Sequence, residues 1–315
     1  MMYVDMLISA LGQGIIYAPM ALGIFIAFRI LNTPDLTIDG SFVFGMAVCA
    51  IVTIGGHPVL GILAGILAGM AAGLVTGFLQ TTFRINPILS GILTMTGLYT
   101  VNYAVLGGQS NRYLQSMVIN KSGVEAPVSS RTIYKMVSLS ENGAVSELIL
   151  SGIIVVILVV MLAVFFKTRP GLALRATGDN EEMVRTSSIN ANLTRRMGIM
   201  LANGLVALSG AMLCQQQRYA DLGNGNGMLV VGLASVIIGQ AIFGKRGVTL
   251  SVISAVVGSV LYRIILQAAY QIDMPSYTVK LISALIVAIS LTLPLIKEKI
   301  DAVQMRRSGE GRVDR

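Results

Sequence analysis

Long apolar runs separated by short polar connections make up most of this chain of 315 residues. A helix needs about 20 mostly apolar residues to cross the hydrocarbon core of a bilayer. Measured against that length, the sequence predicts nine spanning helices, at residues 7–28, 41–55, 59–79, 88–106, 147–166, 197–217, 228–243, 248–270 and 277–296. The second and seventh runs are short, which leaves the number of spans open by one. We therefore expect an all-α, polytopic transmembrane helical bundle.

The composition supports a membrane bundle over soluble domains. Hydrophobic residues make up 54% of the chain and charged residues only 12%, whereas soluble domains carry about 25% charged residues. Too few charges remain to cover two soluble surfaces. We expect one membrane domain over residues 1–297 and a charged tail at 298–315 that is disordered.

The basic residues predict the orientation of the chain. Lys and Arg collect in the cytoplasmic loops of membrane proteins. If the C-terminus lies inside, sixteen of the 23 Lys and Arg residues lie inside as well. This places the N-terminus and the long loop 107–146 outside and the polar segment 167–196 inside. The net charge of +8 is spread along the chain, so we expect no nucleic-acid partner.

Glycines recur at every fourth position in the third span. Such a ridge lets another helix backbone approach closely. The ridge could serve helix packing or line a transport path, and we interpret it as packing. Its members are Gly61, Gly65, Gly69, Gly73 and Gly77.

The chain offers no residues for a metal site or for nucleotide binding. One histidine and two cysteines, Cys49 and Cys214 in apolar runs, match no metal-ligand spacing. Residues 239–246 read Gly-Gln-Ala-Ile-Phe-Gly-Lys-Arg, one position short of a phosphate-binding loop. Arg246 stands where that loop needs the hydroxyl that holds magnesium. We therefore expect no metal and no cofactor in this chain, and no enzymatic activity.

The segment 167–196 is a polar, basic island between two apolar runs. Pro170 and Gly171 end the fifth span, and a short helix is expected over 171–176. A turn at 178–180 follows, where Asp179 or Asn180 can cap a second helix. Charge alone leaves two interpretations open: docking onto a cytosolic protein, or anchoring of the helix ends in anionic lipid.

A resemblance favours docking. Gly171-Leu-Ala-Leu-Arg175-Ala-Thr-Gly178-Asp-Asn180, with Met183-Val-Arg185 after it, resembles the cytoplasmic coupling loop of bacterial ABC importer permeases. The group is the branched-chain amino acid and ribose permease superfamily. Residues 35–42, 86–97 and 232–239 match it too. Together they are similar to the subgroup of tryptophan- and tyrosine-type uptake permeases.

The resemblance implies a transport subunit in the bacterial cytoplasmic (inner) membrane. Two permease subunits, expected as a homodimer, would form a path for a small solute such as an amino acid. A cytosolic dimer of ATP-binding subunits, which holds ATP and Mg²⁺, would drive alternating access. An extracytoplasmic solute-binding protein would deliver the solute to the outer surface, where loop 107–146 lies. The implied ATPase-coupling residues are Gly171, Arg175, Gly178, Asp179, Asn180 and Arg185.

Polar residues at the entrances to two spans suggest a solute path. Segments 34–41 and 84–90 can be re-entrant, broken helix starts of the kind that line transport paths. They can equally be turns at the membrane surface. We select Asp39, Ser41, Asn86, Ser90 and Gln217 as path-facing residues.

The alternative function is a self-contained secondary carrier or channel that works without an ATPase. Such a protein needs charged groups well inside its spans to hold a coupling ion. The acidic residues of this chain lie at span ends, which argues against it.

Overall fold

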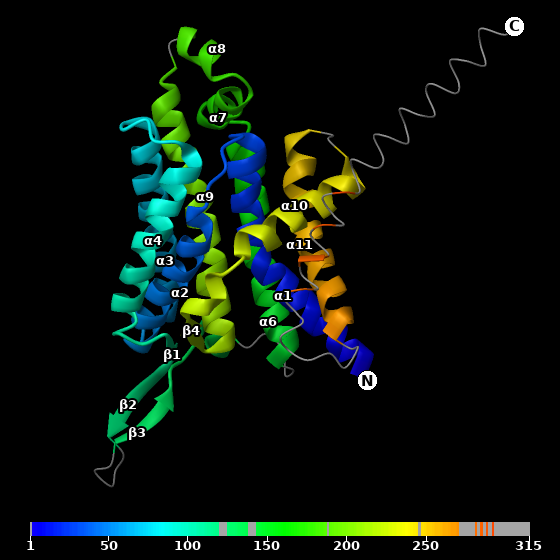
Figure 1. The fold of residues 1–315 in the computed structure, drawn as a ribbon. Helices are drawn as coiled ribbons and strands as arrows, with labels where there is room; N and C mark the ends of the chain where they lie inside the picture. Colours follow the sequence, from blue (N-terminus) through cyan, green and yellow to red (C-terminus); the bar gives the residue numbers. More distant parts are fainter. Residues whose placement is uncertain are drawn as a thin grey trace, which may run out of the picture.

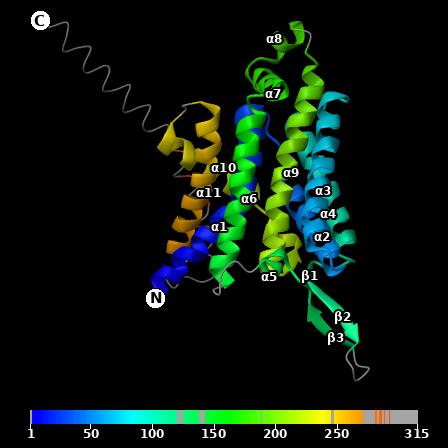
Figure 2. The ribbon, with the colours of Figure 1, turned by 180° about the vertical axis from the view of Figure 1, so that it is seen from behind.

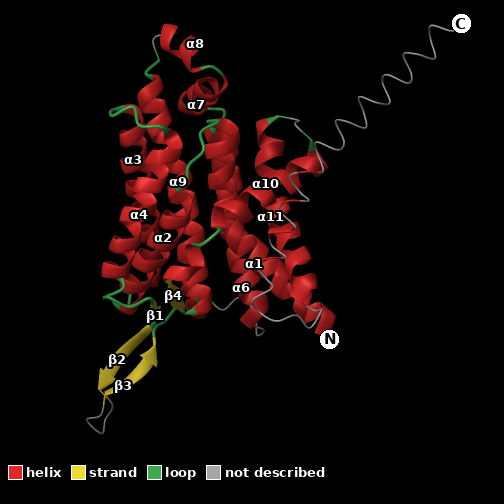
Figure 3. Ribbon diagram, viewed as in Figure 1, coloured by secondary structure: helices red, strands yellow, loops and turns green. Residues whose placement is uncertain are grey.

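The computed structural model describes residues 2–119, 125–137, 143–187, 189–244 and 247–270, with five single positions further on. It is a bundle of long helices that run roughly side by side (Figure 1). Within the described residues, eight helices are long and apolar enough to cross a membrane. A β-hairpin projects from one end of the bundle, and two short helices lie at the other (Figure 3). We name these the hairpin end and the α7–α8 end.

The long helices confirm the fold class expected from the apolar runs. The predicted spans 228–243 and 248–270 coincide with α10 and α11. The ninth predicted span, 277–296, lies outside the described residues except for the five single positions, and the tail 298–315 lies wholly outside them. The long helices are α1 Met2–Ile24, which continues as a π-helix η1 Phe25–Ile30, then α2 Thr37–Ile54, α3 Pro58–Thr81, α4 Pro87–Val105, α6 Gly143–Phe165, α9 Ala191–Gln217, α10 Met228–Phe243 and α11 Val248–Tyr270.

Short elements occupy the two ends. At the hairpin end, β2 Gln115–Ile119 pairs antiparallel with β3 Glu125–Ser129, and β1 Asn111–Tyr113 pairs antiparallel with β4 Tyr219–Asp221. Figure 2 shows α5, the helix Ile133–Met136, beside β1. Much of the predicted loop 107–146 is therefore ordered structure. The remaining short elements are η2 Leu222–Gly225 at the hairpin end and, at the other end, α7 Arg169–Asp179 and α8 Glu181–Thr186.

Helix α9 forms the centre of the bundle, and the glycine ridge of α3 packs on it. All five glycines of the ridge are buried. A side-chain carbon at Gly69 would lie 2.6 Å from the carbonyl oxygen of Asn203, and one at Gly73 would lie 2.6 Å from that of Ile199. Gly65 faces the backbone of Gly45 in α2 in the same way. The missing side chains thus let three backbones approach within contact distance.

The outer face of α6 shows what a lipid-facing surface looks like in this molecule. Its exposed large side chains are all aliphatic or Met: Ile149, Ile153, Val156, Ile157, Val160, Met161 and Val164. Burying such groups among acyl chains is favourable, and none brings a polar group into the hydrocarbon region. Helix α4 differs from this pattern, as described below.

One local prediction is wrong. The sequence predicts a helix over 171–176 and a turn at 178–180, but α7 continues to Asp179 and leaves Asn180 alone between the two helices. Gly178 stays helical because it packs directly on the carbonyl of Ile30, where no side chain would fit. Asn180 caps α8, since its Oδ1 accepts a hydrogen bond from the backbone N–H of Met183 at 3.0 Å.

Candidate functional site

Two helices begin inside the bundle instead of at its surface. After η1 the chain runs back between the helices before α2 starts, and α10 begins part of the way along the bundle (Figure 1). A helix start leaves backbone N–H groups without partners, which is unfavourable away from water. Interrupted helices of this kind occur where transporters bind their solutes.

Asp39, in the first turn of α2, holds the start of α10. Its Oδ1 accepts a hydrogen bond from the backbone N–H of Leu229 at 2.8 Å, and its Oδ2 accepts one from Gly227 at 3.1 Å. The carboxylate satisfies two free N–H groups and lies at the positive end of the α10 dipole. One half-buried side chain therefore fastens the two broken helices together.

A cavity of about 340 Å³ lies beside this junction. It is bounded by the starts of α2 and α10 and by one side of α4. Asp39, Asn102 and Asn226 give it polar walls, and Val43 and Met95 give it apolar ones. No Lys, Arg or His is among its described lining residues. Concave sites of this size with a few converging polar groups are typical of small-molecule binding.

The side of α4 at this cavity carries hydroxyl groups. Thr96, Tyr99, Thr100 and Tyr103 are all exposed, and their spacing places them on one helix face. Tyr99 is 62% exposed. The lipid-facing pattern of α6 contains no such groups, and polar side chains in membrane helices usually face protein or water. This hydroxyl face of α4 is therefore suited to a water-filled path or a second subunit.

A buried polar cluster supports the entrance to α2. Asp35 accepts hydrogen bonds from the backbone N–H of Thr37 at 2.9 Å and from the side-chain amide of Asn203 at 2.7 Å. Asn203 in turn accepts one from Ser41 at 2.6 Å, and Thr37 shares a hydrogen bond with Thr76 at 2.7 Å. All five side chains are fully buried. A buried carboxylate needs such partners, so the cluster joins α2 to α3 and α9.

The five selected path residues lie in different places. Asp39 is at the cavity, while Ser41 belongs to the buried cluster and Ser90 is buried and donates to the carbonyl of Pro87. Asn86 caps α4 at the α7–α8 end. Gln217 is exposed at the end of α9, where its oxygen accepts a hydrogen bond from Asn224 at 3.4 Å.

Sequence reasoning missed the hydroxyl face of α4 and the loop before α10. The spacing of Thr96, Tyr99, Thr100 and Tyr103 was a readable signal, because it places four hydroxyls on one face of the helix. Asn226 offered no signal, since its place depends on where the chain turns back into the bundle.

The six predicted coupling residues divide between two surfaces of the α7–α8 end. Gly171 and Gly178 face the bundle, where Gly171 packs on Phe166 at the turn between α6 and α7. Asp179, Asn180 and Arg185 are exposed and Arg175 is partly exposed. This leaves polar groups pointing away from the membrane helices.

The short helices are firmly joined to the bundle. The side-chain amide of Asn32, just after η1, donates a hydrogen bond to the carbonyl of Gly178 at 3.0 Å. Leu174 of α7 is buried and packs on Gly198 of α9. Glu181 of α8 forms an ion pair with Arg195 of α9. A movement of α7 and α8 is therefore passed to the helices beneath them.

Among the described residues, no three His, Cys, Asp or Glu side chains gather closely enough to hold a metal ion. Cys49 and Cys214 are free thiols and both are buried.

Spanning helices, two broken helices that meet at a polar cavity, and a helix pair fixed to one end define a multi-pass membrane protein of the transport class. A family model described as "Branched-chain amino acid transport system / permease component" matches residues 6–290. The chain belongs to this family of ABC transporter permeases, which are transport subunits.

Individual relatives agree with the family. The chain is 36% identical over 282 residues to a tyrosine transport system permease protein of Clostridioides difficile, covering 89% of this chain and 88% of the relative. It is 32% identical over 292 residues to an uncharacterized protein of Rickettsia prowazekii, covering 91% and 97%. A nucleoside ABC transporter permease protein, NupC of Lactococcus lactis, is 33% identical over 91 residues, 29% of this chain and 27% of that one.

Among solved structures, PsaBC from Streptococcus pneumoniae in complex with Fab superposes with a TM-score of 0.49 at 13% identity, covering 91% of this chain and 90% of that chain.

Proposed function

We propose that this chain is the membrane subunit of an ABC importer, which moves an amino acid or a similar small metabolite inward by alternating access. It would lie in the bacterial cytoplasmic membrane with its N-terminus outside and its C-terminus inside. A separate dimer of ATP-binding subunits would bind ATP and Mg²⁺ and press on the α7–α8 end.

The observation that carries this proposal is the short connection from α7 to the cavity. The carbonyl of Gly178 accepts a hydrogen bond from the side chain of Asn32, and Asp39 follows only seven positions after Asn32. Asp35 lies between them and is held by α9. A displacement of α7 would therefore reach the junction of α2 and α10 through the short segment 31–36, which Asp35 ties to α9 by a hydrogen bond.

A second copy of the chain would complete the path. The hydroxyl face of α4 borders the cavity and has no covering element among the described residues. A second copy, related by two-fold symmetry, would place the same face opposite it. A solute-binding protein would dock at the hairpin end. There the pairing of β1 with β4 joins the segment after α4 to the segment after α9.

The solute class rests on the relatives. The permease named for tyrosine matches along most of this chain, whereas the one named for nucleosides matches over less than a third. This favours an amino acid. The cavity contributes a carboxylate, amides and hydroxyls, which suit the polar groups of such a solute.

Reconstitution with an ATP-binding subunit tests the proposal. The pair should take up solute into proteoliposomes only with ATP, and solute should stimulate ATP hydrolysis. Arg175→Glu and Asp179→Arg should abolish that stimulation, because both reverse charges on the exposed side of α7. Arg131→Glu, an exposed residue at the opposite end, serves as the matched control. Uptake by the chain alone, without the ATPase, would instead establish the secondary-carrier alternative.

A further inference from the structure

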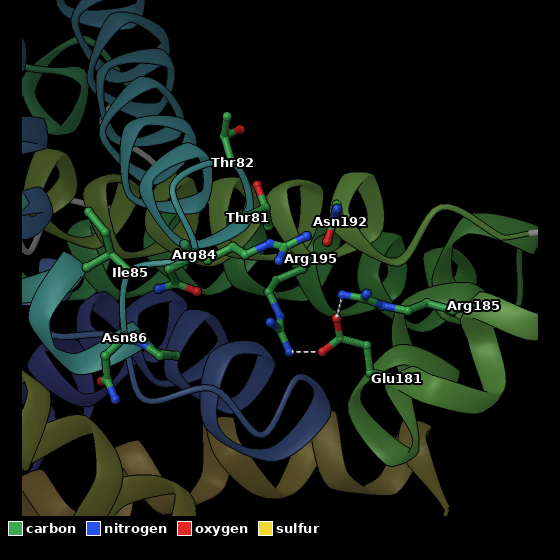
Figure 4. Close-up of a pocket in the computed structure, with 11 residues that line it drawn as sticks. Thr81, Thr82, Arg84, Ile85, Asn86, Glu181, Arg185, Asn192 and Arg195 are labelled. Atoms are coloured by element: carbon green, nitrogen blue, oxygen red, sulfur yellow. Dashed lines mark hydrogen bonds and ion pairs between the residues drawn. The ribbon is translucent and has the colours of Figure 1, made fainter.

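A second pocket, of about 430 Å³, lies at the α7–α8 end. It is formed by the connection between α3 and α4, by α8 and by the first turns of α9. The polar cavity at Asp39 shares none of its lining residues. Figure 4 shows side chains from these three parts of the chain gathered around one space.

The pocket is strongly basic. Arg84, Arg185 and Arg195 line it, with Glu181 as the one carboxylate among its described lining residues. Glu181 is already shared by two of these cations: it pairs with Arg185 at 2.7 Å and also with Arg195 (Figure 4). Two positive charges therefore remain uncompensated in the pocket.

Arg84 has no described carboxylate within ion-pair distance, and its backbone is unusual. Its φ is +54°, a left-handed conformation that few residues other than glycine adopt. Strained backbone of this kind is maintained where the surrounding structure needs a side chain in a set place. Here it directs a guanidinium group towards Arg195 and Asn192 (Figure 4).

Gln80 is the clearest sign that the pocket takes a ligand. The residue is only 5% exposed, yet neither its side-chain nitrogen nor its oxygen has a hydrogen-bond partner. The Nε of Arg195 is also buried without a partner. Buried polar groups nearly always have partners, and leaving one unpaired is costly. These donors, together with Arg84, would be satisfied by one small anion.

We propose that this pocket binds a phosphate group that has a hydroxyl group on it or beside it. Guanidinium and amide N–H groups donate to phosphate oxygens, and the oxygen of Gln80 accepts from the hydroxyl. Two sources carry this chemistry: the headgroup of an anionic lipid such as phosphatidylglycerol, and free inorganic phosphate. Basic pockets between membrane helices suit lipid headgroups. The inference does not depend on which solute crosses the membrane.

Binding to the purified full-length chain in neutral detergent tests the proposal. Phosphatidylglycerol or inorganic phosphate should raise the Tm, while phosphatidylcholine should not. Native mass spectrometry should count about one phosphatidylglycerol per chain if lipid is the source. Protection by inorganic phosphate, without retained phosphatidylglycerol, assigns the site to the free anion.

Three variants make the test specific. Arg84→Gln and Gln80→Leu should each weaken binding about tenfold. The concentration of phosphatidylglycerol or phosphate that gives half of the full rise in Tm should increase by that factor. Gln80→Leu should weaken binding without lowering the ligand-free Tm, because it removes a buried unpaired amide and no hydrogen bond, and leucine has a similar volume. Arg29→Gln removes the same charge from an exposed position at the same end and should bind like the unaltered chain. If all three variants respond equally, or if neither phosphatidylglycerol nor inorganic phosphate raises the Tm, the proposal is wrong.

Discussion

At the scale of single residues, Asp39 is the side chain on which the geometry of the cavity depends. It lies in α2 and accepts two backbone hydrogen bonds from the start of α10, a helix that is distant in the sequence. Both bonds use negatively charged oxygens, and charged acceptors make stronger hydrogen bonds than neutral ones. Its position at a span entrance predicts from the sequence that the residue faces the path. Its partner helix could not be inferred, because 188 residues separate Asp39 from Gly227.

Replacing Asp39 by Asn removes the negative charge and keeps the size and shape of the side chain, so it tests what the charge contributes. The amide keeps one acceptor oxygen, so one of the two N–H groups of α10 loses its partner, which destabilises the junction by about 1–3 kcal/mol. We expect ATP-driven uptake to fall about tenfold or more. Asp221→Asn is the control, because Asp221 also accepts a backbone N–H, from Gly223 at 2.7 Å, but outside the cavity. Uptake equal in the two variants would show that the junction does not limit transport.

At the scale of elements, close packing of α3 on α9 sets how the bundle can move. The two helices touch through glycines, and α9 also holds the buried cluster around Asp35. We expect a pair joined in this way to move as one body. Helix α9 in turn carries Arg195, which is fixed to α8. The closely packed helices α3 and α9, with α8 attached, therefore extend from the α7–α8 end to the cavity.

A single methyl group tests that packing. In Gly69→Ala the new carbon would overlap the side chain of Ala207 and lie 2.6 Å from the carbonyl of Asn203. We expect a loss of about 1–3 kcal/mol from the forced shift of α3, seen as a lower Tm in detergent. Gly152→Ala in α6 is the matched control, since nothing lies within 4 Å of its added carbon. It should be neutral or stabilising, as alanine is the better helix former.

Hydropathy predicted the long helices well because each must be apolar over the bilayer thickness on its own. The end of α10 and the start of α11 follow directly from the glycines and basic residues at 244–247. Sequence could not show that α7 continues through Gly178, because the reason is a contact with Ile30 in a distant segment. It also placed Ser41 and Ser90 on the path, although both side chains are used in internal hydrogen bonds. Local composition says that a hydroxyl is present, and only packing says which way it faces.

At the scale of the whole molecule, the two ends differ in character: strands at one and short polar helices at the other. The excess of Lys and Arg predicts that the α7–α8 end is cytoplasmic. In intact cells, a membrane-impermeant thiol reagent should label Asn111→Cys, next to the hairpin, and leave Ser187→Cys unlabelled. Both positions are exposed, and the natural thiols Cys49 and Cys214 are buried. Labelling of Ser187→Cys from outside would reverse the orientation and remove the basis for an ATPase at that end.

The pairing of β1 with β4 has a consequence for a protein that docks outside. Tyr113 lies beside Tyr219, and the backbone N–H of Leu222 is bonded to the carbonyl of Ser110. Leu222 and Gly225 then form part of the cavity wall. Only a few residues thus separate the hairpin from that wall. If a solute-binding protein docks on the hairpin, as proposed, its docking and the opening of the cavity would be mechanically linked.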